Sequence, residues 1–377
     1  MRPPAEVGMR LDDVDTPALI LDLDAFEANL KRLADALPPR IRVRAHAKTH
    51  KCPEVGKRQI AAGAVGMCCQ KVSEAEAMVD GGIADVLVSN EIVGPRKLER
   101  LAALAKRARM GVCVDHADNV RDLEAAMQRA GAKIDVYIEL EVGMRRCGVA
   151  PGAPAVALAR AIVASPSLRF AGIHAYHGRA QHIRSMEERR ATITKSSLDV
   201  INTKAMLKMA GIECPIVTGA GSGTFMFEVA LGAWDEIQPG SYAFMDSDYA
   251  RNEWAPPMPR FEHSLFVLAT VMSRPNPELA VLDAGLKASS VDSGMPTLWQ
   301  RPGLEYTRAS DEHGWVEFAK VNAAGAAMPA LGEKMLLVPG HCDPTINLYD
   351  WYVCVRGGTK AGVVEALWPI TARGAVN

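Results

Sequence analysis

Residues 110–141, MGVCVDHADNVRDLEAAMQRAGAKIDVYIELE, contain the pattern from which the fold class follows. The two ends of this stretch are short apolar runs that are rich in β-branched residues and finish in polar ones, as buried strands do. Between them Val120, Leu123 and Met127 recur at helical spacing, and a glycine follows at 131. The stretch therefore predicts one strand–helix–strand unit, with its helix over 115–131.

The same unit repeats along the chain. Six further strand candidates are IRVRAHAK (41–48), AVGMCCQ (64–70), DVLVSN (85–90), RFAGIHAYH (169–177), CPIVTG (214–219) and the weaker WDEIQPGSYAFMD (234–246). A second clear helix is expected over 95–108, where Leu98, Leu101 and Ala105 share one face. Eight parallel strands with helices between them over roughly 200 residues fit a closed (β/α)8 TIM barrel. An open doubly wound sheet is the alternative on pattern alone.

The pattern of apolar and turn residues changes after about residue 255. Helical periodicity gives way to strand-like runs between Gly, Pro and Asn turns, namely SLFVLATVMS (264–273), LAVLDAGL (279–286), EKMLLVP (333–339) and YDWYVCVR (349–356). We therefore expect a barrel domain over 14–255 and a mostly-β domain over 256–377. The N-terminal segment 1–24 is expected to contribute a strand to the β domain.

Charge and composition point to a small-molecule partner. The 377 residues include 43 Lys and Arg against 44 Asp and Glu, so no basic surface for nucleic acid or a membrane is expected. No run of about 18 apolar residues predicts a membrane span, and the first residues lack the apolar core of a signal peptide. The eight scattered cysteines include no CxxC pair, which favours reduced thiols and a cytoplasmic location.

In such a barrel the active site forms at the C-terminal ends of the strands. The polar residues at those positions are Arg44, His46, Lys48, Gln70, Asn90, Glu139, Arg145, Arg146, Tyr176 and His177. Strand ends are solvated and polar in any barrel, but this concentration favours a functional site.

A glycine-rich loop, TGAGSGT (218–224), follows the seventh strand candidate. Glycines let backbone amides approach an anion closely, and the loops after strands seven and eight are a recurrent phosphate site in barrels. A tight surface turn is the alternative. Lys48, at the end of the first strand candidate, could have its pKa lowered by burial and neighbouring cations and form a Schiff base with a carbonyl. A lysine combined with a phosphate site is what pyridoxal phosphate requires.

Two further features concern metal binding and proton transfer. If the segment around His341-Cys342-Asp343 is extended, His341 and Asp343 project to one side and could bind a divalent cation such as Mn²⁺, Zn²⁺ or Mg²⁺, with Cys342 pointing away. His182 is a candidate general base. The residues of the loop after the eighth strand could line the barrel mouth or lie on the surface: Asp246, Asp248, Glu253 and Trp254.

Several long motifs resemble one family. They are RAHAKTHKCPE (44–54), GMCCQKVSEAEA (66–77), VSNEIVGPRKL (88–98), AYHGRAQH (175–182), PGSYAFMDSDY (239–249), LDAGLKASSVDSG (282–294), DEHG (311–314) and VPGHCDPTINLYDWYV (338–353). With these motifs the chain resembles the D-threonine aldolases and 3-hydroxy-D-aspartate aldolases, which are fold-type III, alanine-racemase-like pyridoxal-phosphate enzymes.

The resemblance implies roles for individual residues. Lys48 matches the lysine that binds the cofactor covalently, and His182 the catalytic base; His341 and Asp343 match ligands of a divalent metal, Mn²⁺ before Mg²⁺ or Zn²⁺. The other residues implied at the cofactor are Gln70, Arg146, Tyr176, Ser222, Gly223, Thr224 and Tyr242. Two departures are the loop GAGSGT, where relatives commonly have GGGTGS, and Arg145, where relatives often have a smaller residue. The resemblance also implies a homodimer.

The implied activity is cleavage of a D-3-hydroxy amino acid to glycine and an aldehyde. The substrate is D-threonine if the aldehyde is acetaldehyde, and a 3-hydroxyaspartate if it is glyoxylate; the motifs leave this choice open. A D-serine or 3-hydroxyaspartate dehydratase is one alternative, but such relatives usually carry Cys where this chain has Asp343. A non-catalytic pyridoxal-phosphate-binding protein is another, and the second domain argues against it.

Overall fold

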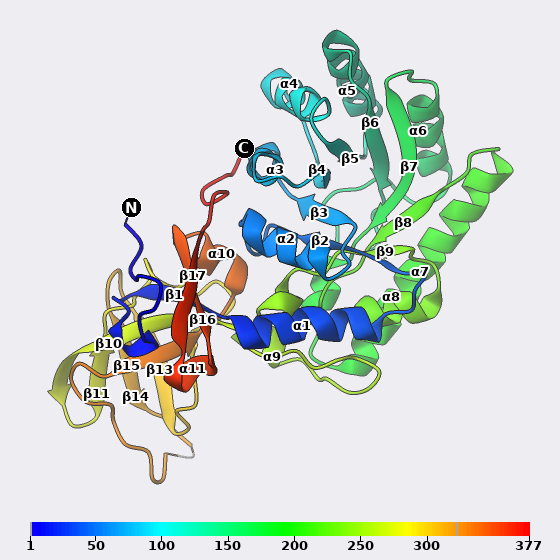
Figure 1. The fold of residues 1–377 in the computed structure, drawn as a ribbon. Coiled ribbons are helices and arrows are strands. Elements are labelled where there is room, and N and C mark those ends of the chain that lie inside the picture. Colours follow the sequence, from blue (N-terminus) through cyan, green and yellow to red (C-terminus); the bar gives the residue numbers. More distant parts are fainter. Residues whose placement is uncertain (1, 322) are drawn as a thin grey trace.

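The computed structural model describes residues 2–321 and 323–377. Figure 1 shows a barrel with its surrounding helices beside a smaller domain built mainly of strands. Helix α1 (Leu23–Ala36) leads from the smaller domain along the outside of the barrel, and the C-terminus returns to the barrel at α3. The amide of Ser73 donates to the carbonyl of Asn377 over 2.9 Å, which attaches this end of the chain.

The larger domain is a closed parallel barrel, in the order β2 through β9 with β9 pairing back to β2. Its strands are β2 (Arg42–His46), β3 (Gly66–Cys69), β4 (Asp85–Glu91), β5 (Arg109–Val114), β6 (Ile134–Glu139), β7 (Leu168–Ala175), β8 (Ile216–Gly219) and β9 (Glu236–Ile237). Each predicted run overlaps one of these strands. The (β/α)8 barrel is therefore confirmed, and the open sheet is excluded.

The helices that follow the strands cover the outside of the barrel. They are α2 (Pro53–Ala61), α3 (Val72–Asp80), α4 (Pro95–Leu104), α5 (Ala117–Ala130), α6 (Ala153–Val163), α7 (Met186–Met209) and α8 (Phe225–Leu231). Helix α5 begins after His116, whose side chain accepts from the amide of Asp118, and ends at Gly131 in the left-handed conformation (φ 62°). Glycine is favoured there because it adopts positive φ without steric cost.

In the described residues the second domain is a nine-stranded sheet in which β1 (Ala18–Asp22) is central, antiparallel to β10 and parallel to β16. The other strands are β10 (Leu265–Asn276), β11 (Leu279–Leu282), β12 (Thr297–Leu298), β13 (Leu304–Ala309), β14 (Gly314–Phe318), β15 (Lys334–Val338), β16 (Trp351–Arg356) and β17 (Val363–Pro369). The short helices are η1 (Leu11–Asp13), η2 (Gly178–His182), η3 (Ser241–Ala243), α9 (Ser247–Ala250), α10 (Cys342–Ile346) and α11 (Gly358–Ala361). The C-terminal mostly-β architecture is thus confirmed.

The second domain packs on the side of the barrel where the strands end. The amide of Cys342 donates to Asp246 over 3.1 Å, and the amide of Ser247 donates to the carbonyl of Pro339 over 2.9 Å. The Tyr352 hydroxyl reaches back to the carbonyl of His50 over 2.8 Å. These contacts place α10 at the barrel mouth. Among the described residues, no helix combines the length and apolar character needed to cross a membrane.

Because β1 joins the two halves of the second sheet, we predict that truncating its buried side chains destabilises the protein. Ile20 is 0% exposed and packs in a core cluster with Phe266 and Val353. Ile20→Ala is expected to lower the free energy of unfolding by about 2–5 kcal/mol, measured by urea denaturation. The control Val163→Ala, at a side chain 59% exposed on α6, is expected to have almost no effect. Equal losses in both variants would contradict this role of β1.

Candidate active site

A cavity of about 400 Å³ opens at the barrel mouth and is lined by residues from the ends of most barrel strands. Of the polar strand-end residues, those that line it are His46, Lys48, Gln70, Arg146 and Tyr176. Those that do not are Arg44, Asn90, Glu139, Arg145 and His177. The predicted base His182 lines the same cavity, so the structure brings most of the expected site together.

Lys48 lies in the turn directly after β2 and its amine forms an ion pair with the Asp343 carboxylate from the second domain. Burial alone would lower the pKa of Lys48, but the charge of Asp343 outweighs burial and raises the pKa above its usual value. Our expectation of a lowered lysine pKa was therefore wrong, because sequence reasoning could not place Asp343 beside Lys48. The same pairing overcomes burial of Asp343 and lowers its pKa to about 2.

Two glycine-serine turns form one wall of the cavity. Gly221 and Ser222 come from the loop after β8, and Gly240 and Ser241 from the loop after β9. A Cβ at Gly240 would collide with the Thr49 hydroxyl and lie 3.2 Å from the His46 carbonyl oxygen. Only a glycine thus lets this loop approach the end of β2 so closely. The wall carries the short hydroxyl and backbone groups that a phosphate needs.

Three residues predicted at the phosphate have other direct contacts. The amide of Gly223 donates to Gln181 Oε1 over 2.9 Å, and Gln181 Nε2 donates to the Thr224 hydroxyl over 2.8 Å. The Tyr242 hydroxyl accepts from Gln59 over 3.2 Å, whereas its backbone amide donates to Ser222 Oγ over 2.9 Å. These three residues hold the loops in shape, and none of them lines the cavity.

Arg146 and Tyr176 lie together, with the guanidinium carbon 5.6 Å from the centre of the tyrosine ring. Glu139 accepts from Arg146 over 3.3 Å and holds the guanidinium at the cavity. Gln70 Nε2 lies 3.0 Å from His46 Nε2. These contacts fix a cation, an aromatic ring and an amide in one wall.

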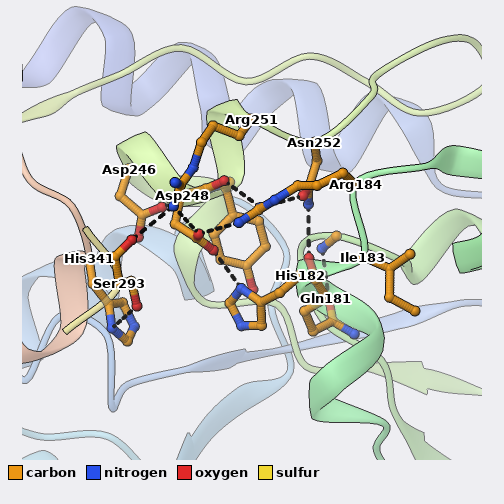
Figure 2. A network of polar contacts seen from close by, with 12 residues as sticks. Gln181, His182, Ile183, Arg184, Asp246, Asp248, Arg251, Asn252, Ser293 and His341 are labelled. Carbon is orange, nitrogen blue, oxygen red and sulfur yellow. Dashed lines mark hydrogen bonds and ion pairs between the residues drawn. The ribbon is translucent and has the colours of Figure 1, made fainter. Parts of the chain in front are cut away.

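His182 is oriented by an aspartate that sequence analysis had left unassigned (Figure 2). Its Nδ1 lies 2.6 Å from Asp248 Oδ2, while Arg184 and Arg251 pair with the other carboxylate oxygen. Burial would raise the pKa of Asp248, but Arg184 and His182 outweigh it and keep that pKa below its usual value. With Nδ1–H directed at this carboxylate, Nε2 is free to accept a proton.

None of the four candidate residues of this loop lines the cavity, and the three besides Asp248 have structural contacts. Asp246 accepts from the amides of Tyr249 and Cys342, Glu253 accepts from the amide of Met186 over 2.9 Å, and Trp254 donates to the Tyr249 carbonyl over 3.0 Å. They fasten the loop in place. No local pattern separates them from Asp248, because all four occur in one short polar segment.

The predicted metal ligands do not lie on an extended segment. His341 precedes α10 and Asp343 is in its first turn, so the alternation expected of a strand does not apply. His341 Nδ1 is 2.8 Å from Asp292 Oδ2, and Cys342 Sγ points away to the Met245 carbonyl, as expected. Binding of a metal by His341 and Asp343 stays a prediction.

A second group of metal-ligand type was not foreseen. Cys113, Glu139 and His174 lie inside the barrel with ligand atoms within 4.8 Å of one another. Each residue comes from a different strand, so only barrel closure brings them together. Sequence spacing carries no signal for such a group.

Together these features define a class of protein. A parallel barrel that carries a lysine, an arginine–tyrosine pair and two glycine-serine turns around one cavity has the donor set for a phosphorylated aldehyde cofactor. The residues therefore fit pyridoxal phosphate.

Comparisons with known proteins agree with this class. Residues 21–248 match the model of the alanine racemase N-terminal domain, and residues 264–355 match a putative serine dehydratase domain. A D-threonine aldolase of Arthrobacter sp is 49% identical, covering 99% of this chain and 96% of the relative. A 3-hydroxy-D-aspartate aldolase of Paracoccus denitrificans is 46% identical, covering 98% and 95%.

The solved D-threonine aldolase from Filomicrobium marinum superimposes with a TM-score of 0.95, at 55% identity and with 99% and 100% of the two chains covered. The chain belongs to the D-threonine aldolase and 3-hydroxy-D-aspartate aldolase family, a family of PLP-dependent aldehyde-lyases. The resemblance drawn from its motifs is confirmed. A D-threo-3-hydroxyaspartate dehydratase of Delftia is only 27% identical, so the aldolases are favoured over the dehydratases.

The buried Glu228 behind the glycine-serine wall generates a prediction about pH. Burial raises its pKa from 4.5 to about 7, although the Thr224 hydroxyl donates to it. A folded-state pKa above the unfolded one means stability that is present below pH 4.5 and is lost as pH rises through about 7. Glu228→Gln, which keeps an acceptor for Thr224, is expected to flatten the fall in melting temperature between pH 5 and 8. An unchanged slope would contradict the raised pKa.

Proposed function

We propose that this protein cleaves the Cα–Cβ bond of a D-3-hydroxy amino acid, either D-threonine or 3-hydroxy-D-aspartate, to glycine and acetaldehyde or glyoxylate. The observation that supports this proposal most directly is that one cavity is lined by Lys48 and by His182, whose Nδ1 is hydrogen-bonded to the Asp248 carboxylate. Similarity to aldolases for both substrates supports the class of reaction. A homodimer and a cytoplasmic location belong to the same proposal.

The residues that line the cavity indicate how it would hold the cofactor. Lys48 would hold pyridoxal phosphate through Nζ, and the turns with Ser222 and Ser241 would hold its phosphate, supported from behind by Gly223 and Thr224. Arg146 and Tyr176 would flank the ring. When bound, this cofactor accepts the electron pair that the broken bond leaves on Cα.

His182 performs the proton transfer in this proposal. Its Nε2 removes the proton from the Cβ hydroxyl, the oxygen forms the aldehyde carbonyl, and the bonding pair passes to Cα. Asp248 is a positioning residue: it keeps the imidazole orientation and stabilises the positive charge that the ring acquires. Arg184 and Arg251 hold Asp248 in turn.

His341 and Asp343 would hold the divalent cation, whose charge makes the substrate hydroxyl more acidic. Asp343 Oδ1 is buried and has no hydrogen-bond partner among the described residues, which suits a cation ligand. An imidazole and a carboxylate are compatible with Mn²⁺, and also with Mg²⁺ or Zn²⁺.

The test of this function uses the purified protein with pyridoxal phosphate and Mn²⁺. We expect glycine together with acetaldehyde from D-threonine or glyoxylate from D-configured 3-hydroxyaspartate, and loss of both products on chelation. Lys48→Ala is expected to abolish turnover and cofactor absorbance, whereas Lys57→Ala, at an exposed ion pair with Glu54, is expected to change neither. Formation of ammonia and a 2-oxo acid instead would identify a dehydratase.

Variants at His182 and Asp248 separate the base from its positioning residue. His182→Ala is expected to lower kcat about 10²- to 10⁴-fold. Asp248→Asn is expected to lower kcat about 10- to 100-fold. It should leave KM for the amino acid nearly unchanged, because the substrate still binds while the imidazole loses the carboxylate that orients it for proton transfer.

The control is Asp118→Asn, at an exposed carboxylate on α5. A rise of KM together with a lowered melting temperature in Asp248→Asn would show a merely structural role.

A further inference from the structure

The cavity at the barrel mouth is lined by cations and by no carboxylate among the described residues. Its basic side chains other than histidine are Lys48, Arg146 and Arg179. Lys48 is paired with Asp343 and Arg146 with Glu139, so two of the three charges are balanced. A cavity lined by one sign of charge concentrates ligands of the opposite sign.

Among the described basic residues that line the cavity, Arg179 is the one whose side chain has no polar partner. Its guanidinium has no hydrogen bond or ion pair among residues 2–321 and 323–377, and the residue is exposed where it lines the cavity. A phosphate and a substrate carboxylate would each bring negative charge into this cavity. An unpaired guanidinium therefore supplies a bidentate site for one anionic group.

The position of Arg179 relative to His182 indicates which anionic group the guanidinium would bind. Both residues belong to the 3₁₀ helix η2 (Gly178–His182), three positions apart. Because a 3₁₀ helix has three residues per turn, side chains at this spacing lie on the same face. His182 acts at the hydroxyl on Cβ in the proposed function, so Arg179 faces the Cβ end of the substrate.

The backbone of η2 is held firmly enough to position this side chain. Gln181 bridges to Gly223 and Thr224, and its carbonyl accepts from Asn252 over 2.8 Å. The amide of Ala180 donates to His177 Nδ1 over 3.2 Å. The segment is therefore hydrogen-bonded both to the glycine-rich loop behind the glycine-serine wall and to the loop that carries Asp248.

We propose that Arg179 is a specificity-determining residue that binds an anionic group on Cβ, so that the enzyme prefers a D-3-hydroxy amino acid with a second carboxylate to D-threonine. This inference rests on the proposed function and adds the substrate class. A methyl group on Cβ leaves the guanidinium without a partner, whereas a carboxylate there forms a charge-assisted pair with it.

Steady-state kinetics with both substrates test the assignment. Arg179→Met, which removes the charge and keeps the length, is expected to raise KM for D-configured 3-hydroxyaspartate about tenfold or more and KM for D-threonine less than twofold. Arg179→Lys should restore part of the difference. Arg145→Met removes the same charge from a residue next to Arg146 that does not line the cavity, and should leave both KM values unchanged.

Two results would overturn the proposal. An equal rise of KM for both substrates would assign Arg179 to the α-carboxylate, which both share. An unchanged KM for both would show that Arg179 does not contact substrate.

A binding measurement on the holoenzyme is independent of turnover. Malate and 3-hydroxybutyrate are the two substrates without their amino group, and they differ only in the carboxylate or methyl on the hydroxyl-bearing carbon. The wild type is expected to bind malate more tightly, by calorimetry, and Arg179→Met is expected to lose that difference. Equal affinity of the wild type for both would refute the proposal. If instead neither amino acid is cleaved while the malate preference and its loss are observed, the proposed function fails and the anion site stands.

Discussion

Closure of the barrel between β2 and β9 is the constraint on which the rest of the molecule depends. Arg42 and Val43 pair with Glu236 and Ile237, and inside this seam Arg44 Nε donates to Glu236 Oε1 over 3.0 Å. Arg44 also pairs with Asp85 on β4 over 2.6 Å, so its buried charge is compensated from two strands. The closed register brings the turn that carries Lys48 beside loops from the far end of the barrel sequence.

The second domain completes the mouth that this closure creates. It supplies Asp343 to Lys48 and places His341 beside Asp292. Arg251 continues the connection, since it pairs with Asp248 and also donates to the Ser293 carbonyl over 2.8 Å (Figure 2). The candidate base in the barrel is thus joined to the candidate metal ligand His341 in the β domain through Asp248, Arg251 and Ser293, whose hydroxyl lies 3.4 Å from His341 Nδ1.

The parts of the site that the sequence predicted depend on residues close together in the chain, whereas the parts it missed depend on contacts between distant segments. Lys48 and the Ser222 turn were found because strand ends and glycine-rich loops are recognisable locally. The pairing of Lys48 with Asp343 spans the two domains, and it reversed the expected direction of the lysine pKa. Gln181, which holds the glycine-rich loop, was missed because a glutamine in a polar segment has no pattern that distinguishes it.

Hydrophobic periodicity and turn residues alone established the eight barrel strands and the β-rich C-terminal third of the chain, because each depends on neighbours within a few residues. The motifs also nominated Lys48 and His182. Only the folded chain shows that Asp248 pairs with His182, that the Tyr242 hydroxyl contacts Gln59, and that Arg179 lines the cavity without a polar partner among the described residues. These outcomes depend on which side chains from distant segments meet, and that is decided by packing rather than by local sequence.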